Sequence, residues 1–206
     1  TFDPSQIPPS ETATSTSIIY NNKGYIIDAT EPIYVALRIQ NSIHASALVS
    51  KGSAALGTTF RTGTFASYNA DFTYMNFVSI MATSDNTQVI INNIDEDVDI
   101  LDFDEDRIGR NINGTYNDIV INLNRGQSYI VAVKAAEGNL EDPQGIHPFR
   151  TANGGGLIGT LISSDKPVVV NSGSISGSND HTVRGGRDFG MDQLVGIEKI
   201  GTEYIF

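Results

Sequence analysis

The stretch that decides the fold is Phe77-Val78-Ser79-Ile80-Met81-Ala82-Thr83-Ser84-Asp85-Asn86-Thr87-Gln88-Val89-Ile90-Ile91. Two short apolar runs flank Ser84-Asp85-Asn86, and these three residue types favour turns. Apolar runs of this length, bounded by turn-forming residues, are typical of β-strands. The stretch therefore predicts two strands that pair as a tight hairpin.

The same pattern continues along the chain in both directions. Residues 118–123 and 128–131 are expected to pair through Asn124-Arg125-Gly126-Gln127, and residues 157–162 and 167–171 through Ser163-Ser164-Asp165-Lys166. Further strands are expected at residues 17–20, 25–27, 33–39, 44–49 and 58–61. Helical periodicity is absent from every run of 10 to 12 residues, and the best candidate for a helical turn is residues 189–195. These features predict an all-β, mainly antiparallel β-sandwich or jelly-roll-like fold with very little helix.

The domain organisation follows from where the strand pattern begins. Residues 1–16 are rich in Pro, Ser and Thr and lack apolar periodicity, so we expect an extended leader or linker. Residues 17–206 are expected to form the β-sandwich module, as one domain or as two subdomains. Asn153-Gly154-Gly155-Gly156 is the candidate hinge, although a loop is the preferred interpretation. The abrupt start at Thr1 and the apolar end at Phe206 suggest a fragment of a longer protein.

Composition excludes several classes of partner. The chain has 206 residues, of which 13 are basic and 24 acidic, giving a formal net charge of −11. Because nucleic-acid binding requires Lys and Arg at the phosphates, we expect no nucleic-acid partner. We expect no membrane insertion, because every apolar run falls well short of the roughly 20 residues that a spanning helix needs. The chain contains no cysteine, which excludes disulfides, thiolate metal sites and thiol catalysis.

The residues that could carry catalysis do not form a recognisable set. Gly173-Ser174-Ile175-Ser176-Gly177 is the nearest match to a nucleophile elbow, but Ile175 stands where the serine belongs, so a flexible Gly/Ser loop is preferred. His44, His147 and His181 are not spaced as metal ligands. A glycosidase needs two carboxylates across a cleft, and the sequence places no such pair. We therefore expect no enzymatic activity, and a polysaccharide hydrolase is the least favoured alternative.

An acidic tract is the most concentrated chemical signal in the chain. Carboxylates at alternate positions suit calcium, which takes six to eight oxygen ligands. The tract begins like a helix-loop-helix calcium loop, but Arg107 replaces the expected Gly and Asn113 the closing Glu. A solvated acidic loop is the first interpretation, and a calcium site in a looser loop is the alternative; no other cofactor is expected. The candidate ligands are Asp95, Asp97, Asp99, Asp102, Asp104 and Asp106.

A second candidate site lies in the Gly-rich residues 179–190. Arg184 and Arg187 stand among glycines, and Asp188 follows them. Guanidinium groups can bind carboxylates or carbohydrate hydroxyls through two parallel hydrogen bonds, but they can equally fix a loop through an internal Arg–Asp pair. Arg184, Arg187 and Asp188 are therefore candidate ligand-binding residues, with a structural role as the competing interpretation.

Several segments resemble a known family. They are Lys51-Gly52-Ser53-Ala54-Ala55-Leu56-Gly57-Thr58-Thr59-Phe60-Arg61, residues 76–83 with 85–89, residues 164–173, residues 186–194 and residues 197–204. From about Tyr34 onward the chain is similar to the IgGFc-binding protein N-terminal-like module of large Bacteroidetes surface proteins exported by the type IX secretion system. It departs from that pattern at Gly196, where Pro is expected, and in the acidic tract.

The resemblance implies an extracellular or cell-surface location and a non-catalytic adhesion or scaffold role. Its expected partners are an extracellular protein or glycan and the neighbouring domains of the same parent chain. It supplies no catalytic residues. A carbohydrate-binding domain, assisted by calcium at the acidic tract, is the alternative function.

Overall fold

The computed structural model describes residues 16–41, 44–63, 75–94, 100, 118–134, 157–177 and 188–203. Within these residues the chain is all-β and mainly antiparallel, which confirms the predicted fold class. The helical elements described are two short 3-10 turns, η2 (Gly52–Ala55) and η4 (Ile197–Lys199). The strands are β1 (Ile19–Tyr20), β2 (Ala36–Asn41), β3 (His44–Val49), β4 (Gly57–Arg61), β5 (Met75–Ala82), β6 (Thr87–Asn92), β7 (Ile119–Leu123), β8 (Ser128–Lys134), β9 (Leu161–Gly177) and β10 (Asp188–Gln193).

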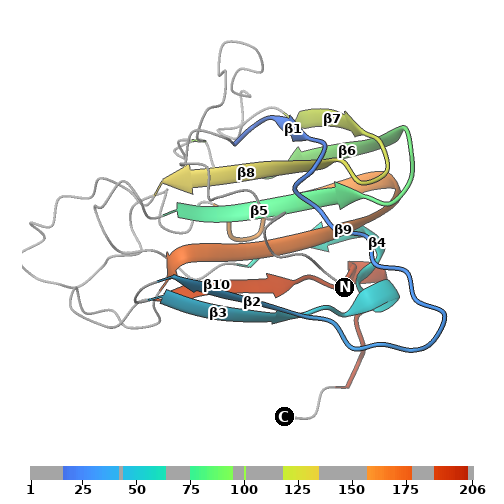
Figure 1. The fold of residues 1–206 in the computed structure, drawn as a ribbon. Coiled ribbons are helices and arrows are strands. Elements are labelled where there is room, and N and C mark those ends of the chain that lie inside the picture. Colours follow the sequence, from blue (N-terminus) through green and yellow to red (C-terminus); the bar gives the residue numbers. More distant parts are fainter. Residues whose placement is uncertain are drawn as a thin grey trace, which may run out of the picture.

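Strand β9 joins the two halves of one bent sheet (Figure 1). Its first residues, 161–164, pair with β6, and residues 161–163 pair with β4. Residues 168–174 pair with β5, and residues 171–177 pair with β10. The order along the sheet is β1-β8-β5-β9-β6-β7, so β1, β8 and β5 lie on one half and β6 and β7 on the other.

Among the described residues, the two halves enclose one cluster of buried apolar side chains. Alternate residues of β5, β6, β7, β8 and β9 contribute to it, as the two-residue period of a strand requires. Ile80 of β5, Val89 of β6 and Ile162 of β9 are essentially inaccessible to solvent. The rest of the cluster is Phe60, Val78, Ala82, Ile91, Ile94, Ile100, Ile119, Leu123, Tyr129, Val131, Val133, Leu157, Val168 and Val170. Burial of this cluster supplies the main driving force for bringing the halves together.

All three predicted hairpins are wrong, although the strands themselves exist. β5 pairs with β8 and β9 rather than with β6, and β7 pairs with β6 rather than with β8. The predicted turns at residues 84–86 and 124–127 instead carry the chain from one half of the sheet to the other. The third pair is one continuous strand, β9, bent at residues 164–167.

Side chains fix the corner at which these three segments cross. Asp165 accepts a hydrogen bond from the Gln88 amide at 2.8 Å, and the Lys166 ammonium donates to the carbonyls of Asp85 (2.6 Å) and Asn86 (2.9 Å). The Thr83 hydroxyl donates to the Pro167 carbonyl at 2.6 Å. At this corner, the side chains of turn-forming residues thus supply hydrogen-bond partners for backbone groups that do not pair with a neighbouring strand.

Three further local predictions are corrected by the structure. Residues 25–27 are not a strand, and residues 157–159 form a turn before β9 begins at Leu161. The helical turn expected at residues 189–195 is not formed, because residues 188–193 are β10 and their backbone pairs with β9. The Gly/Ser sequence at residues 173–177 is the end of β9 and not a loop.

The hairpin β2–β3 lies beside the main sheet. Its strands pair along their full length, from Ala36 opposite Val49 to Asn41 opposite His44. Of the two hairpin strands, β3 lies nearer to β10, and Figure 1 shows the hairpin at the β10 side of the sheet.

Candidate functional site

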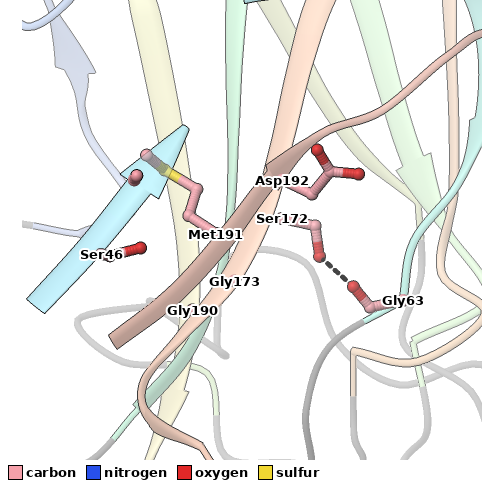
Figure 2. Close-up of a pocket in the computed structure, with 8 residues that line it drawn as sticks. Ser46, Gly63, Ser172, Gly173, Gly190, Met191 and Asp192 are labelled. Atoms are coloured by element: carbon pink, nitrogen blue, oxygen red, sulfur yellow. Dashed lines mark hydrogen bonds between the residues drawn. The ribbon is translucent and has the colours of Figure 1, made fainter. Parts of the chain in front are cut away.

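A pocket of about 420 Å³ lies between β3, β9 and β10 (Figure 2). Its lining combines hydroxyl groups, small side chains and exposed backbone. The lining comes from β3, β9, β10 and the segment just after β4. The pocket therefore depends on the position of β10 and of the β2–β3 hairpin beside the main sheet. The lining residues are Ser46, Ala47, Gly63, Ser172, Gly173, Gly190, Met191 and Asp192. We call this space the β3–β10 pocket.

Gly173 allows the backbones of β9 and β10 to approach closely at the base of this pocket. A Cβ atom at position 173 would lie 2.3 Å from the Gly190 carbonyl oxygen and 2.9 Å from the Phe77 ring. Phe77 faces Gly173 across the β5–β9 pairing and stacks on Phe189 of β10, with ring centroids 5.9 Å apart. Glycine is therefore required here by close approach of backbone and ring.

Two side chains define opposite sides of the β3–β10 pocket. The Ser172 hydroxyl donates a 2.6 Å hydrogen bond to the Gly63 carbonyl, which fixes the segment after β4 against β9. Figure 2 shows Met191 extending from β10 toward β3 and Ser46. Methionine is flexible and polarizable, so it can adapt to different neighbours.

Lys51 connects the end of β3 to the end of β10. Its ammonium donates to the Asp192 carboxylate at 2.8 and 3.0 Å and also to the Gln193 carbonyl. Its backbone amide donates to the Gln193 side chain at 2.5 Å. The Asp192 side chain is 66% exposed, so the ion pair itself contributes little, and the hydrogen bonds to Gln193 set the strand alignment.

Glu198 connects the turn η4 to β4. Its carboxylate accepts a 2.7 Å hydrogen bond from the Thr58 amide, and Lys199 beside it donates to the Ser53 carbonyl at 3.1 Å. Partial burial raises the pKa of Glu198, but hydrogen bonds from the backbone of Glu198, Thr58 and Thr59, together with the charge of Lys199, outweigh it. The pKa of this carboxyl is consequently lowered. A lowered pKa means that the folded state favours the charged carboxylate.

Glu198→Gln should lower the melting temperature at pH 7 by about 1–2 °C, because the site is exposed and screened. The folded pKa lies below the unfolded one, so the stabilising effect is present at neutral pH and is lost as the pH falls through the folded pKa. Thermal unfolding of both proteins between pH 7 and pH 3 checks this. The two melting temperatures should converge in acid; a constant difference would contradict the assignment.

The chemistry of the β3–β10 pocket suits binding by backbone and small side chains. Asp192 is the one ionisable group of the eight lining residues, and it is paired with Lys51. An acid–base mechanism needs a second titratable group positioned toward the reacting atoms, and the eight described lining residues supply none. None of the eight described lining side chains is aromatic, so these residues offer no ring on which a sugar could stack.

The site residues chosen from sequence fall mostly outside the described residues. Arg184, Arg187 and the six aspartates from Asp95 to Asp106 all lie there, and Asp188 is described only as the first residue of β10, opposite Gly177. Within the described ranges, no three His, Asp or Glu side chains gather as metal ligands. The arginine site, the calcium site and the calcium-assisted glycan-binding alternative therefore stay predictions.

Comparison with known proteins decides the family. The sequence profile of a family described as IgGFc binding protein matches residues 45–206, well over half of the chain. The chain belongs to the IgGFc-binding protein family. This confirms the resemblance to the IgGFc-binding module, while the Bacteroidetes and type IX secretion context stays a prediction. The matched region runs from Ala45 in β3 through β10 and contains the whole described lining of the β3–β10 pocket. No curated protein and no solved structure matches the chain significantly.

The IgGFc-binding protein family consists of binding modules and is not known as a family of enzymes. In the described part of this member, no helix is long and apolar enough to cross a membrane. Sequence reasoning missed the β3–β10 pocket. The available signal was Gly173 and Gly190 within apolar, strand-like runs, since a glycine inside a strand often marks a close backbone approach.

Proposed function

We propose that this chain is a non-catalytic adhesion or scaffold module of a large exported bacterial protein, acting outside the cell or at its surface. The observation that carries the proposal is the family match over residues 45–206. An extracellular protein is the favoured partner, in keeping with the binding named in the family's description. The resemblance of the quoted segments to Bacteroidetes surface proteins supports export through the type IX secretion system.

The exposed apolar side chains support a role in contacts with other macromolecules. Most large hydrophobic side chains that are exposed in the described residues lie between Ile18 and Val49, before and within the β2–β3 hairpin. Tyr34 is 76% exposed and Ile33 is 57% exposed. Clustered exposed apolar residues commonly mark interaction surfaces, whereas isolated ones need no explanation.

Localisation of the parent protein tests this proposal. Antibodies raised against the 206-residue chain should detect the parent protein in the outer-surface and culture-medium fractions. Brief treatment of intact cells with protease should remove the signal from the cell surface. A cytoplasmic marker protein that survives the same treatment is the control for cell lysis. A parent protein found only in the cytoplasmic fraction would exclude the proposed function.

A further inference from the structure

The outer edge of β2 is open in the described part of the chain. β2 pairs with β3 on one side, and no described strand pairs with its other side. An open edge carries backbone donors and acceptors that can pair with another extended chain. Natural proteins usually protect such edges with charges, proline or a covering segment; the six residues of β2 include one charged side chain, that of Arg38, and no proline.

The register identifies which backbone groups face outward. The Ser50 amide donates to the Val35 carbonyl at 3.0 Å, in line with the pairing of Ala36 with Val49. In an antiparallel pair, hydrogen-bonded and non-hydrogen-bonded residue pairs alternate. The groups of residues 37, 39 and 41 therefore face β3. The amide and carbonyl groups of Ala36, Arg38 and Gln40 face away from it, repeating roughly every 7 Å.

One face of the hairpin adds an apolar surface beside this edge. Directly opposite residues lie on the same face of an antiparallel pair, so Leu37 and Leu48 share a face with Ile39 and Ser46. Leu37 is 40% exposed, Ile39 is 37% exposed, and Leu48 is half-buried. A strand added to β2 would extend this apolar face and cover part of it.

We propose that the edge of β2 binds an extended polypeptide segment of a partner protein, which adds to the hairpin as a further strand. This inference rests on the proposed function and names the kind of partner that the module binds. The segment carries apolar side chains at alternate positions, which pack beside Leu37 and Ile39. It is neutral to basic, because the chain's charge of −11 repels acidic partners.

A second copy of the chain is a poorer occupant of the same edge. Two copies would each bring a charge of −11 to the interface. Two-fold antiparallel pairing centred on residue 38 would also place Arg38 opposite Arg38, and like charges directly opposite each other destabilise a strand pair. A foreign segment avoids both costs.

Binding of a synthetic peptide to the 206-residue chain tests the proposal. The probe is the fluorescently labelled peptide Lys-Thr-Val-Thr-Val-Thr-Val-Lys, measured by fluorescence anisotropy at low salt. A matched peptide with N-methyl groups on alternate amides keeps the side chains but lacks the hydrogen-bond donors. A third peptide with Glu in place of both Lys residues tests the charge preference. We expect binding of the first peptide, and at least about tenfold weaker binding of the other two.

Variants of β2 separate edge binding from non-specific attraction. Arg38→Pro removes an outward amide and leaves the bonds to β3 in place, since proline is tolerated on the open side of an edge strand. It should weaken peptide binding about tenfold or more, whereas Arg38→Gln should retain binding within about threefold. If Arg38→Pro alters the circular dichroism spectrum, the double variant Leu37→Ser with Ile39→Ser provides the test, because both side chains are already partly exposed.

The outcomes distinguish this inference from the proposed function. Equal binding of the N-methylated peptide, or unchanged binding by both the Arg38→Pro and the Leu37→Ser/Ile39→Ser variants, would overturn strand addition at β2. A dimer formed without peptide and abolished by Arg38→Pro would assign the edge to a second copy, which also overturns it. Each of these three results leaves a surface location of the parent protein intact, and a cytoplasmic location would refute the proposed function whatever the peptide does.

Discussion

Phe60→Ala should lower the free energy of unfolding by about 3–5 kcal/mol, because truncating a buried phenylalanine removes apolar burial and leaves a cavity. Phe60 is completely buried in β4 and lies opposite Ile162 of β9. β9 is the strand with which β4 pairs in the described sheet, so the packing of Phe60 does much to hold β4 against the core. Urea unfolding followed by circular dichroism measures the change.

Val120→Ala is the matched control for Phe60→Ala. Val120 lies on β7 in the same sheet, but its side chain is 50% exposed. Substitutions at such surface positions usually change stability by less than about 0.5 kcal/mol. If both variants lost the same small amount, Phe60 would not be part of the core as described.

Gly173→Ala should cost about 1–3 kcal/mol, because the added methyl group has no room. The new Cβ would lie 2.3 Å from the Gly190 carbonyl oxygen and 3.1 Å from the Met191 Cα atom, both of which are backbone atoms of β10. The clash should push β10 away from β9 and separate the stacked rings of Phe77 and Phe189. Thermal unfolding measures the stability, and hydrogen exchange of the β10 amides reports the displacement.

Gly63→Ala provides the control within the same pocket. Gly63 also lines the β3–β10 pocket, but no atom of the described residues lies within 4 Å of a Cβ atom built there. Among the described residues this position has open space, so its substitution should leave the melting temperature and the exchange of the β10 amides nearly unchanged. Equal destabilisation by the two alanines would show that close packing of β9 on β10 is not what requires Gly173.

The sequence predicted strands well because their signal is local. Apolar runs bounded by turn residues fixed β3, β5, β6, β7 and β8 to within a few residues. Strand pairing was predicted wrongly because the same turn-forming residues occur in a hairpin and in a connection between the two halves of a sheet. Asn86 shows this: its φ of 51° is common in hairpin turns, yet here it carries the chain from β5 to β6.

The family was identified correctly from short segments, whereas the β3–β10 pocket was not foreseen. Its lining comes from residues far apart in the sequence, such as Ser46 and Met191, and no local pattern reports that they meet. Residues 173–177 were interpreted as a flexible loop because Gly and Ser dominate there. In the structure their backbone is fixed by pairing with β10, and β5 pairs with Gly173 and Ser174.

The long strand β9 also bears on how such a module withstands pulling. β9 is hydrogen-bonded to β4, β5, β6 and β10, and it runs through both halves of the sheet. A tensile load applied to either half is therefore transmitted to the other through continuous covalent backbone and not through side-chain packing alone. Separating the two halves would require removal of β9 from its neighbouring strands, so many hydrogen bonds would have to break together.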